Sequence, residues 1–167
     1  MAELNATDMI VEIKENVKTG DTLKAQLVLS HMNEVDKQTQ NRLLYELSRA
    51  DVNFSIPVLL YLLTEHGEIT DDLPIVRETF LSNLMAYPEF INKLLDDPSV
   101  KDKTHVIRIA GELRYEEATQ SLLNLLSVCE DEAEMMIIIE TLGLIGDPLA
   151  VNTLTDHLYA ANRDLII

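Results

Sequence analysis

The stretch that decides the fold is ETLGLIGDPLAVNTLTDHL, residues 140–158, because an earlier segment repeats its pattern. LGLIGDPLAVNTLTDHL, from Leu142, aligns with AGELRYEEATQSLLNLL, from Ala110, so that small and apolar residues coincide at a constant offset of 32 residues. An internal offset of about 20–50 residues is the signature of a solenoid built from one supersecondary unit. The coinciding pairs are Gly111 and Gly143, Leu113 and Ile145, Ala118 and Ala150, Leu122 and Leu154, and Leu126 and Leu158.

The repeated unit is predicted to be two helices joined by the turn Gly146–Asp147–Pro148. Gly146 permits an unusual backbone angle, Asp147 can cap the following helix, and Pro148 suits a first helical position. Apolar residues three and four apart continue through almost the whole chain, separated by short polar breaks. This spacing predicts about ten helices, and the short connections make sequential neighbours roughly antiparallel.

Residues 140–158 resemble the HEAT repeat, in particular the short HEAT-like form associated with phycobilin lyases. The matching residues are Leu142, Gly143, Ile145, Gly146, Asp147, Pro148, Ala150, Val151, Leu154 and Leu158. The resemblance implies an all-α fold, a right-handed α-solenoid (superhelix) of about five antiparallel helix pairs, HEAT/armadillo-like. We expect one domain over residues 1–167, with the clearest repeats at 100–129 and 131–160.

The resemblance weakens toward the N-terminus. The copy that starts at Ala110 has Arg114–Tyr115–Glu116 where the later copy has Gly-Asp-Pro, and both copies lack the Val-Arg pair that often follows in the family. FLSNLMAYPEFINKLLDD, from Phe80, fits the unit with a residue gained or lost at the turn. Residues 1–70 fit it loosely, so two readings stay open: HEAT repeats, or helices of another kind.

Two local expectations concern the first half of the chain. Asp21 or Thr22 is expected to cap a helix whose buried side carries Leu23, Leu27, Val28 and Met32. The stretch GEITDDLP, residues 67–74, is expected to be a turn followed by a helix start with Pro74 in its first turn.

Charge restricts the class of partner. The chain has 13 Lys+Arg against 29 Asp+Glu, a formal charge of −16, which opposes binding to phosphate backbones and to anionic lipid. A basic protein would be attracted, although the same acidity is also explained by solubility alone. The single cysteine, Cys129, excludes an internal disulfide, and no apolar run approaches the roughly 20 residues of a membrane span. With the polar start MAELNATDMIVE, these features predict a cytoplasmic protein.

No catalytic or metal site is expected. The four histidines, at positions 31, 66, 105 and 157, lack the i, i+4 spacing of a helical zinc site, and there is no Cys-x-x-Cys motif. Cys129 precedes a run of acids that should raise its pKa and weaken it as a nucleophile. The paired carboxylates lie at turns or helix starts, where capping and solvation explain them. We therefore predict a non-catalytic protein without a cofactor.

Candidate binding residues follow from the resemblance, since the second helix of each HEAT pair commonly lines the concave side. On the second helices of the two matched repeats, the outward positions are Gln120, Asn124, Asn152 and Asp156. Tyr61, Glu65 and Lys93 are the candidates earlier in the chain, with Tyr115 and Tyr159 as further aromatic contacts. The simpler reading is that these residues only form solvated helix faces.

The sequence leaves three functions open. The first is a scaffold that binds a basic or mixed partner protein through an acidic concave face. The alternative is an accessory subunit or chaperone resembling bilin lyases, which handles a cofactor-bearing partner. The third, a nucleic-acid-binding HEAT protein of the DNA-glycosylase type, is opposed by the charge. The apolar end of the chain, Leu165–Ile167, leaves three alternatives open: it mediates self-association, folds back over the last helix pair, or marks a truncated boundary.

Overall fold

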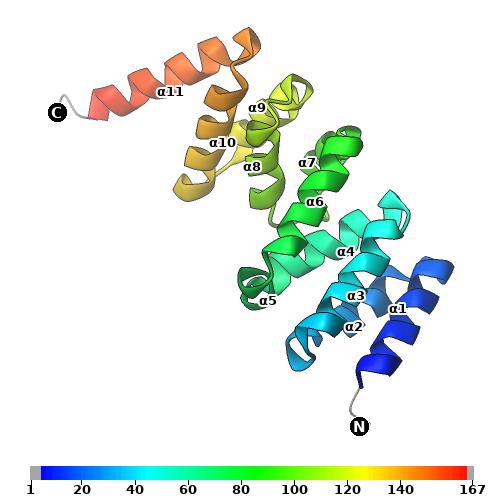
Figure 1. Ribbon diagram of the computed structural model, residues 1–167. Helices are drawn as coiled ribbons and strands as arrows, with labels where there is room; N and C mark the ends of the chain where they lie inside the picture. The colour runs from blue at the N-terminus through cyan, green and yellow to red at the C-terminus, as the bar shows by residue number, and fades with distance from the viewer. Residues whose placement is uncertain (1–4, 165–167) are drawn as a thin grey trace. The chain divides into compact units, whose positions relative to one another are not determined.

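The computed structural model describes the backbone of residues 5–164 and the side chains of residues 5–160. Every element in this part of the chain is a helix, so the predicted all-α class is confirmed (Figure 1). The chain divides into two compact units, Met1–Tyr87 and Pro88–Ile167. The single domain stays a prediction, and each unit is described by itself.

The N-terminal unit is a set of helices packed in two layers (Figure 1). Helix α1 packs on α3, and α2 packs on α4, as expected for two successive antiparallel pairs; α6 also packs on α4. The elements are α1 (Ala6–Thr19), α2 (Thr22–Leu29), η1 (Met32–Glu34), α3 (Lys37–Arg49), α4 (Val52–Glu65), α5 (Gly67–Asp72) and α6 (Pro74–Ala86).

The sequence signals for helix ends hold in this unit. Gly20 ends α1 in the left-handed conformation, with φ of 72°, and its N–H donates to the carbonyl of Asn16. Asp21 caps α2 by accepting from the backbone N–H of Lys24, and Asp36 caps α3 in the same way through Thr39. Pro74 occupies the first turn of α6, as expected.

Two expectations for this unit are wrong. Leu23 and Leu27 were expected on the buried side of α2, but they are 76% and 65% exposed. This short helix has apolar residues on more than one side, and the side that packs is the opposite one, which carries Ala25, Val28 and Leu29. The stretch expected as a turn contains the short helix α5, whose one fully apolar side chain, Ile69, is buried.

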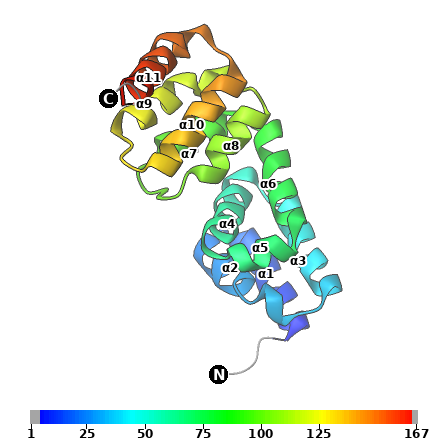
Figure 2. The ribbon, with the colours of Figure 1, turned by 90° about the vertical axis from the view of Figure 1, so that its left-hand side faces the viewer.

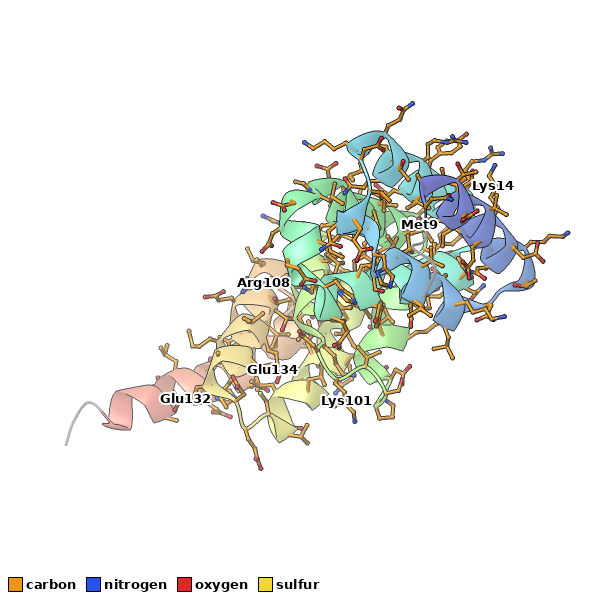
Figure 3. The ribbon with its side chains drawn as sticks, turned by 90° about the horizontal axis from the view of Figure 1, so that it is seen from below. Met9, Lys14, Lys101, Arg108, Glu132 and Glu134 are labelled. Atoms are coloured by element: carbon orange, nitrogen blue, oxygen red, sulfur yellow. The ribbon has the colours of Figure 1, made fainter. Side chains whose placement is uncertain are left out.

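The C-terminal unit contains the clearest repeats (Figure 2). Its elements are α7 (Glu89–Asp96), α8 (Thr104–Glu112), η2 (Glu116–Ala118), α9 (Thr119–Val128), α10 (Glu132–Ile145), η3 (Pro148–Ala150) and α11 (Val151–Asp164). The first helices of the two repeats, α8 and α10, pack on each other most extensively, and α7 packs on α9. The acids after Cys129 begin α10: Asp131 caps it, and Glu132 and Glu134 project from its first turn (Figure 3).

The turn that decided the fold has the predicted geometry. Gly146 is left-handed, with φ of 72°, and the Asp147 carboxylate accepts a hydrogen bond from the N–H of Leu149 at 2.9 Å. Pro148 begins η3. In the preceding copy, the equivalent residue Arg114 also has a positive φ, at 49°, so the two turns share this backbone conformation although their sequences differ.

The repeat pairs are buried to different extents. Ala118 and Ala150 are both buried, but Leu126 is buried where Leu158 is 62% exposed. Gly111 is buried against α10, whereas its equivalent Gly143 is exposed. The sequence match therefore fixes the position of each residue in the repeat, while burial depends on which helix lies beside it.

A buried lysine closes the end of α7. The Lys103 ammonium donates to the backbone carbonyls of Asp97, at 2.5 Å, and Leu94, at 3.3 Å. These carbonyls lie at the helix C-terminus, where a cation is favoured by the helix dipole. Burial lowers the pKa of Lys103 from its usual range, against the raising effect of Asp97 and Asp96.

Replacing Lys103 with methionine is expected to lower the free energy of unfolding by roughly 1–3 kcal/mol, because two carbonyls lose their donor.

The same variant tests the pKa of Lys103. Since the pKa of Lys103 in the folded chain lies below the unfolded value of 10.5, the unfolded chain holds more protons in the window below pH 10.5. The stability of the natural chain relative to this variant should therefore rise with pH in that window. Urea denaturation at several pH values measures both effects. Lys101→Met, at an exposed neighbour, serves as the control and should change stability by less than about 0.5 kcal/mol.

Candidate functional site

The predicted binding residues of the C-terminal unit lie on its second helices. Lys93 comes from α7, Gln120 and Asn124 from α9, and Asn152 and Asp156 from α11, and all five are exposed. We call these five residues the second-helix face. Residues four apart share one side of a helix, so Gln120 lies beside Asn124, and Asn152 beside Asp156.

A groove separates α9 from α11 at this face. It has a volume of about 410 Å³ and is lined by Leu123, Leu126, Ser127, Thr153, Asp156, His157 and Ala160. Leucine and alanine side chains supply its apolar surface, and Asp156 and His157 contribute the polar groups from α11. Such a groove can receive an apolar side chain of a partner while the carboxylate of Asp156 contacts a donor or a cation beside it.

Three other residues of the second-helix face, Gln120, Asn124 and Lys93, make local contacts. The side-chain amide of Gln120 donates to the Asn124 side-chain oxygen at 3.0 Å. The Lys93 ammonium lies 4.4 Å from the centre of the Phe90 ring, in a cation–π contact on the same helix. Both contacts orient exposed side chains without burying them, so these groups remain accessible to a partner.

Tyr61 and Glu65 belong to α4 of the N-terminal unit, and the structure does not join them to the second-helix face. Glu65 is exposed, but Tyr61 is half-buried and already has a partner. Its hydroxyl lies 3.2 Å from Nε2 of His66, whose Nδ1 lies 3.2 Å from a carboxylate oxygen of Glu68. Tyr61 therefore anchors the end of α4 as well as facing solvent, a role that its spacing in the sequence does not reveal.

The two other tyrosines differ in exposure. Tyr159 on α11 is 63% exposed, as a contact residue should be. Tyr115 is half-buried, and its hydroxyl donates to the Glu117 carboxylate at 2.5 Å. This hydrogen bond, with burial and the charges of Glu117 and Glu89, raises the pKa of Tyr115 to about 12. Tyr115 thus helps to hold the turn before α9.

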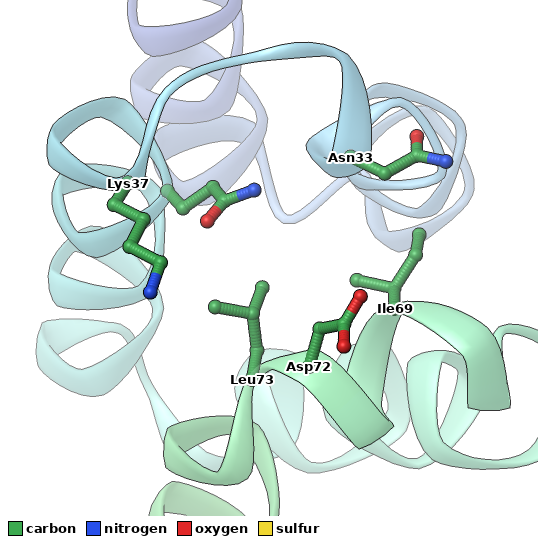
Figure 4. A pocket seen from close by; sticks show the side chains of 6 residues that line it. Asn33, Lys37, Ile69, Asp72 and Leu73 are labelled. Atoms are coloured by element: carbon green, nitrogen blue, oxygen red, sulfur yellow. The ribbon is translucent and has the colours of Figure 1, made fainter.

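A second cavity, in the N-terminal unit, was not anticipated from the sequence. It has a volume of about 330 Å³ and lies where α5 faces the turn between α2 and α3. Figure 4 shows Ile69, Asp72 and Leu73 rising from α5 and its end toward Asn33 and Lys37. Lys37 and Asp72 give its walls opposite charges. Because α5 was expected to be a turn, the sequence offered no way to place these residues together.

Cys129 has the environment of an unreactive thiol. It is half-buried, and its Sγ lies 3.3 Å from the Asp131 carbonyl and 3.7 Å from a carboxylate oxygen of Glu134. Burial raises the pKa of Cys129, and the charge of Glu134 adds to this effect. The predicted raised pKa agrees with this environment, although burial, rather than the acids, is its largest cause.

The described residues provide neither a metal-binding cluster nor a membrane-spanning helix. Residues 5–160 contain no group of three or more His, Cys, Asp or Glu side chains arranged to hold a metal ion. Among the helices that the structure describes, none is both long and apolar enough to cross a membrane.

Comparison with known proteins supports the repeat assignment. Residues 87–166 match the family described as HEAT repeats, and this region nearly coincides with the C-terminal unit. Neither the curated proteins nor the solved structures contain a match to the chain. HEAT repeats generally mediate protein–protein interaction and are typically non-catalytic. Together with the helical pairs described above, the match shows that residues 87–166 are similar to HEAT repeats, in a chain whose described elements are all helical.

Proposed function

We propose that this protein is a non-catalytic scaffold, or adaptor, that binds a partner protein through the second-helix face. The observation that carries the proposal is the groove between α9 and α11, which combines apolar side chains with Asp156 at an exposed face. A partner segment that inserts an apolar residue there would be held by burial, while polar contacts along the rim would fix its register.

The charge of the chain indicates the kind of partner. A formal charge of −16 attracts a basic protein at long range and increases its rate of association. We therefore propose a partner with lysine or arginine beside the apolar anchor, positioned to meet Asp156. The proposal also places the protein in the cytoplasm, where its free cysteine would remain reduced.

The proposal is tested by affinity capture from the native lysate, with the retained proteins identified by mass spectrometry. The bait is the full chain, and each capture is made at about 0.15 M and about 1 M salt. Charges on exposed surfaces act over about 8 Å at the lower salt concentration and about 3 Å at the higher. We expect a stoichiometric basic partner that is retained at low salt and largely lost at high salt.

Two charge-reversing variants locate the contact. Asp156→Lys should weaken capture of that partner at least tenfold, whereas Glu12→Lys, on an exposed position of α1, should leave it nearly unchanged. Equal losses in both variants would show that only the overall charge matters and would reject the second-helix face as the site. If the chain instead retains a pigment or another small molecule and no protein, the bilin-lyase-like alternative replaces the scaffold.

A further inference from the structure

The outward side of α10 repeats a surface of α8 that already binds a helix. Four residues define this side, which we call the α10 outer face: Met136, Ile139, Glu140 and Gly143. At the repeat offset of 32 residues, their equivalents on α8 are Thr104, Ile107, Arg108 and Gly111. Because α10 covers this surface of α8, we expect the equivalent surface of α10 to bind a helix as well.

On α8, the surface is covered by α10 at close range. Ile107 and Gly111 are buried. A Cβ atom added at Gly111 would lie 3.3 Å from both Thr141 Cγ2 and Leu144 Cδ1, and 3.5 Å from Thr141 Cα. Glycine at this position therefore lets the backbone of a neighbouring helix approach α8 more closely than a side chain would allow.

On α10, the same surface is open. A Cβ atom added at Gly143 meets no described atom within 4 Å outside its own helix and chain neighbours. Met136 is 55% exposed, and Ile139 is half-buried. The α10 outer face thus has a glycine with open space beside it, an exposed Met136 and a partly exposed Ile139.

The charged residue differs in sign between the two helices. Arg108 of α8 and Glu140 of α10 lie on opposite walls of one groove of about 120 Å³ between the helices, and the α8 wall also carries Glu112. At the α10 outer face, Glu140 takes the position that Arg108 has on α8. A helix that packs there in the same manner would need lysine or arginine where α10 has Glu140. Glu132 and Glu134, in the first turn of α10, make the surroundings more acidic (Figure 3).

We propose that the α10 outer face is a docking surface for a basic amphipathic helix of a partner protein. The occupant packs an apolar stripe on Ile139 and Met136, approaches the backbone at Gly143, and places a lysine or arginine against Glu140. A second copy of this chain fits less well, because each copy carries a formal charge of −16 and would bring like charges together. The surface belongs to the first helix of its repeat, so it is separate from the second-helix face.

The test uses a peptide derived from α10 itself, because α10 already packs on the equivalent surface of α8. The probe is a fluorescent peptide with the sequence of Glu132–Ile145, in which Glu132, Glu134 and Glu140 are replaced by lysine. The natural acidic sequence is the control peptide, with the same apolar stripe. Titration of the full chain, followed by fluorescence anisotropy, should show saturable binding of the basic peptide and at least tenfold weaker binding of the acidic one.

Three variants of the full chain decide where the peptide binds. Gly143→Leu fills the close-approach position and should weaken binding of the basic peptide at least tenfold, with circular dichroism confirming an unchanged fold. Glu140→Lys should weaken the basic peptide and improve binding of the acidic one. Glu89→Lys makes the same charge change at an exposed position of α7 and should leave both affinities within about twofold.

Several results would overturn the proposal. Undiminished binding to Gly143→Leu would mean that the peptide displaces α10 from α8 and does not use the outer face. Equal affinity for the two peptides would remove the role of Glu140. Absence of saturable binding, or self-association that buries Gly143, would reject a basic helix as the occupant.

Discussion

Replacing Gly111 with leucine should lower the free energy of unfolding by about 3 kcal/mol. A side chain at this position would meet Thr141 and Leu144 of α10 at distances where even a single Cβ is crowded. The Thr141 Cα already lies at van der Waals distance, 3.5 Å, from that Cβ position, so the further atoms of a leucine would have to displace α10 as well as its side chains. Overpacking of this kind typically costs about 1–3 kcal/mol, and the close backbone places Gly111→Leu at the upper end. Chemical denaturation followed by circular dichroism measures the change.

Gly143→Ala is the matched control, because it changes the equivalent position in the next repeat. There the added methyl group meets no described atom, and alanine favours a helix over glycine by roughly 0.8–1 kcal/mol. We expect a stability equal to or slightly above that of the natural chain. Equal stability of Gly111→Leu and Gly143→Ala would show that α10 does not pack closely on α8 at Gly111. Gly143 would then give no reason to expect a helix to dock on the α10 outer face.

The contrast between these glycines shows how far the sequence predicts the fold. The repeat, the left-handed Gly146 and the Asp147 cap could be predicted, because each depends on residues adjacent in the chain. Burial at Gly111 and exposure at Gly143 could not, because the two positions look alike until the neighbouring helices are placed. The same reason explains Leu23 and Leu27: a short helix with apolar residues on more than one side does not reveal which side will pack.

The candidate site was also only partly predictable from the sequence. The repeat pattern placed Asn152 and Asp156 on an outward side of α11, and the structure shows both exposed. It did not predict the groove beside Asp156, which depends on the separation of α9 from α11. Nor did it predict that His66 contacts Tyr61, because the two side chains meet only once the end of α4 has folded. The exposed positions of a helix can be predicted from the spacing of its apolar residues. Grooves and side-chain contacts depend on how the helices pack and cannot be predicted in this way.

Leu59→Ala should lower the free energy of unfolding about as much as Gly111→Leu, and it also tests the predicted single domain. Leu59 is fully buried in α4, which packs on α2 and α6 in the N-terminal unit. Truncating a buried leucine to alanine costs about 2–5 kcal/mol, because apolar contacts are lost and a cavity remains. For a chain of this length, each kcal/mol shifts the Tm by about 2–4 °C, so a loss of about 3 kcal/mol predicts a fall of about 6–12 °C.

Differential scanning calorimetry of the full chain gives the decisive comparison. If residues 1–167 are one domain, a single transition with equal calorimetric and van't Hoff enthalpies should move as a whole in Leu59→Ala. Leu27→Ala makes the same chemical change at an exposed position of α2 and should alter stability by less than about 0.5 kcal/mol. Two transitions, of which only one moves, would instead show that the units Met1–Tyr87 and Pro88–Ile167 unfold separately. The HEAT assignment of residues 87–166 would then describe an independently stable domain, and the N-terminal helices would form a second one.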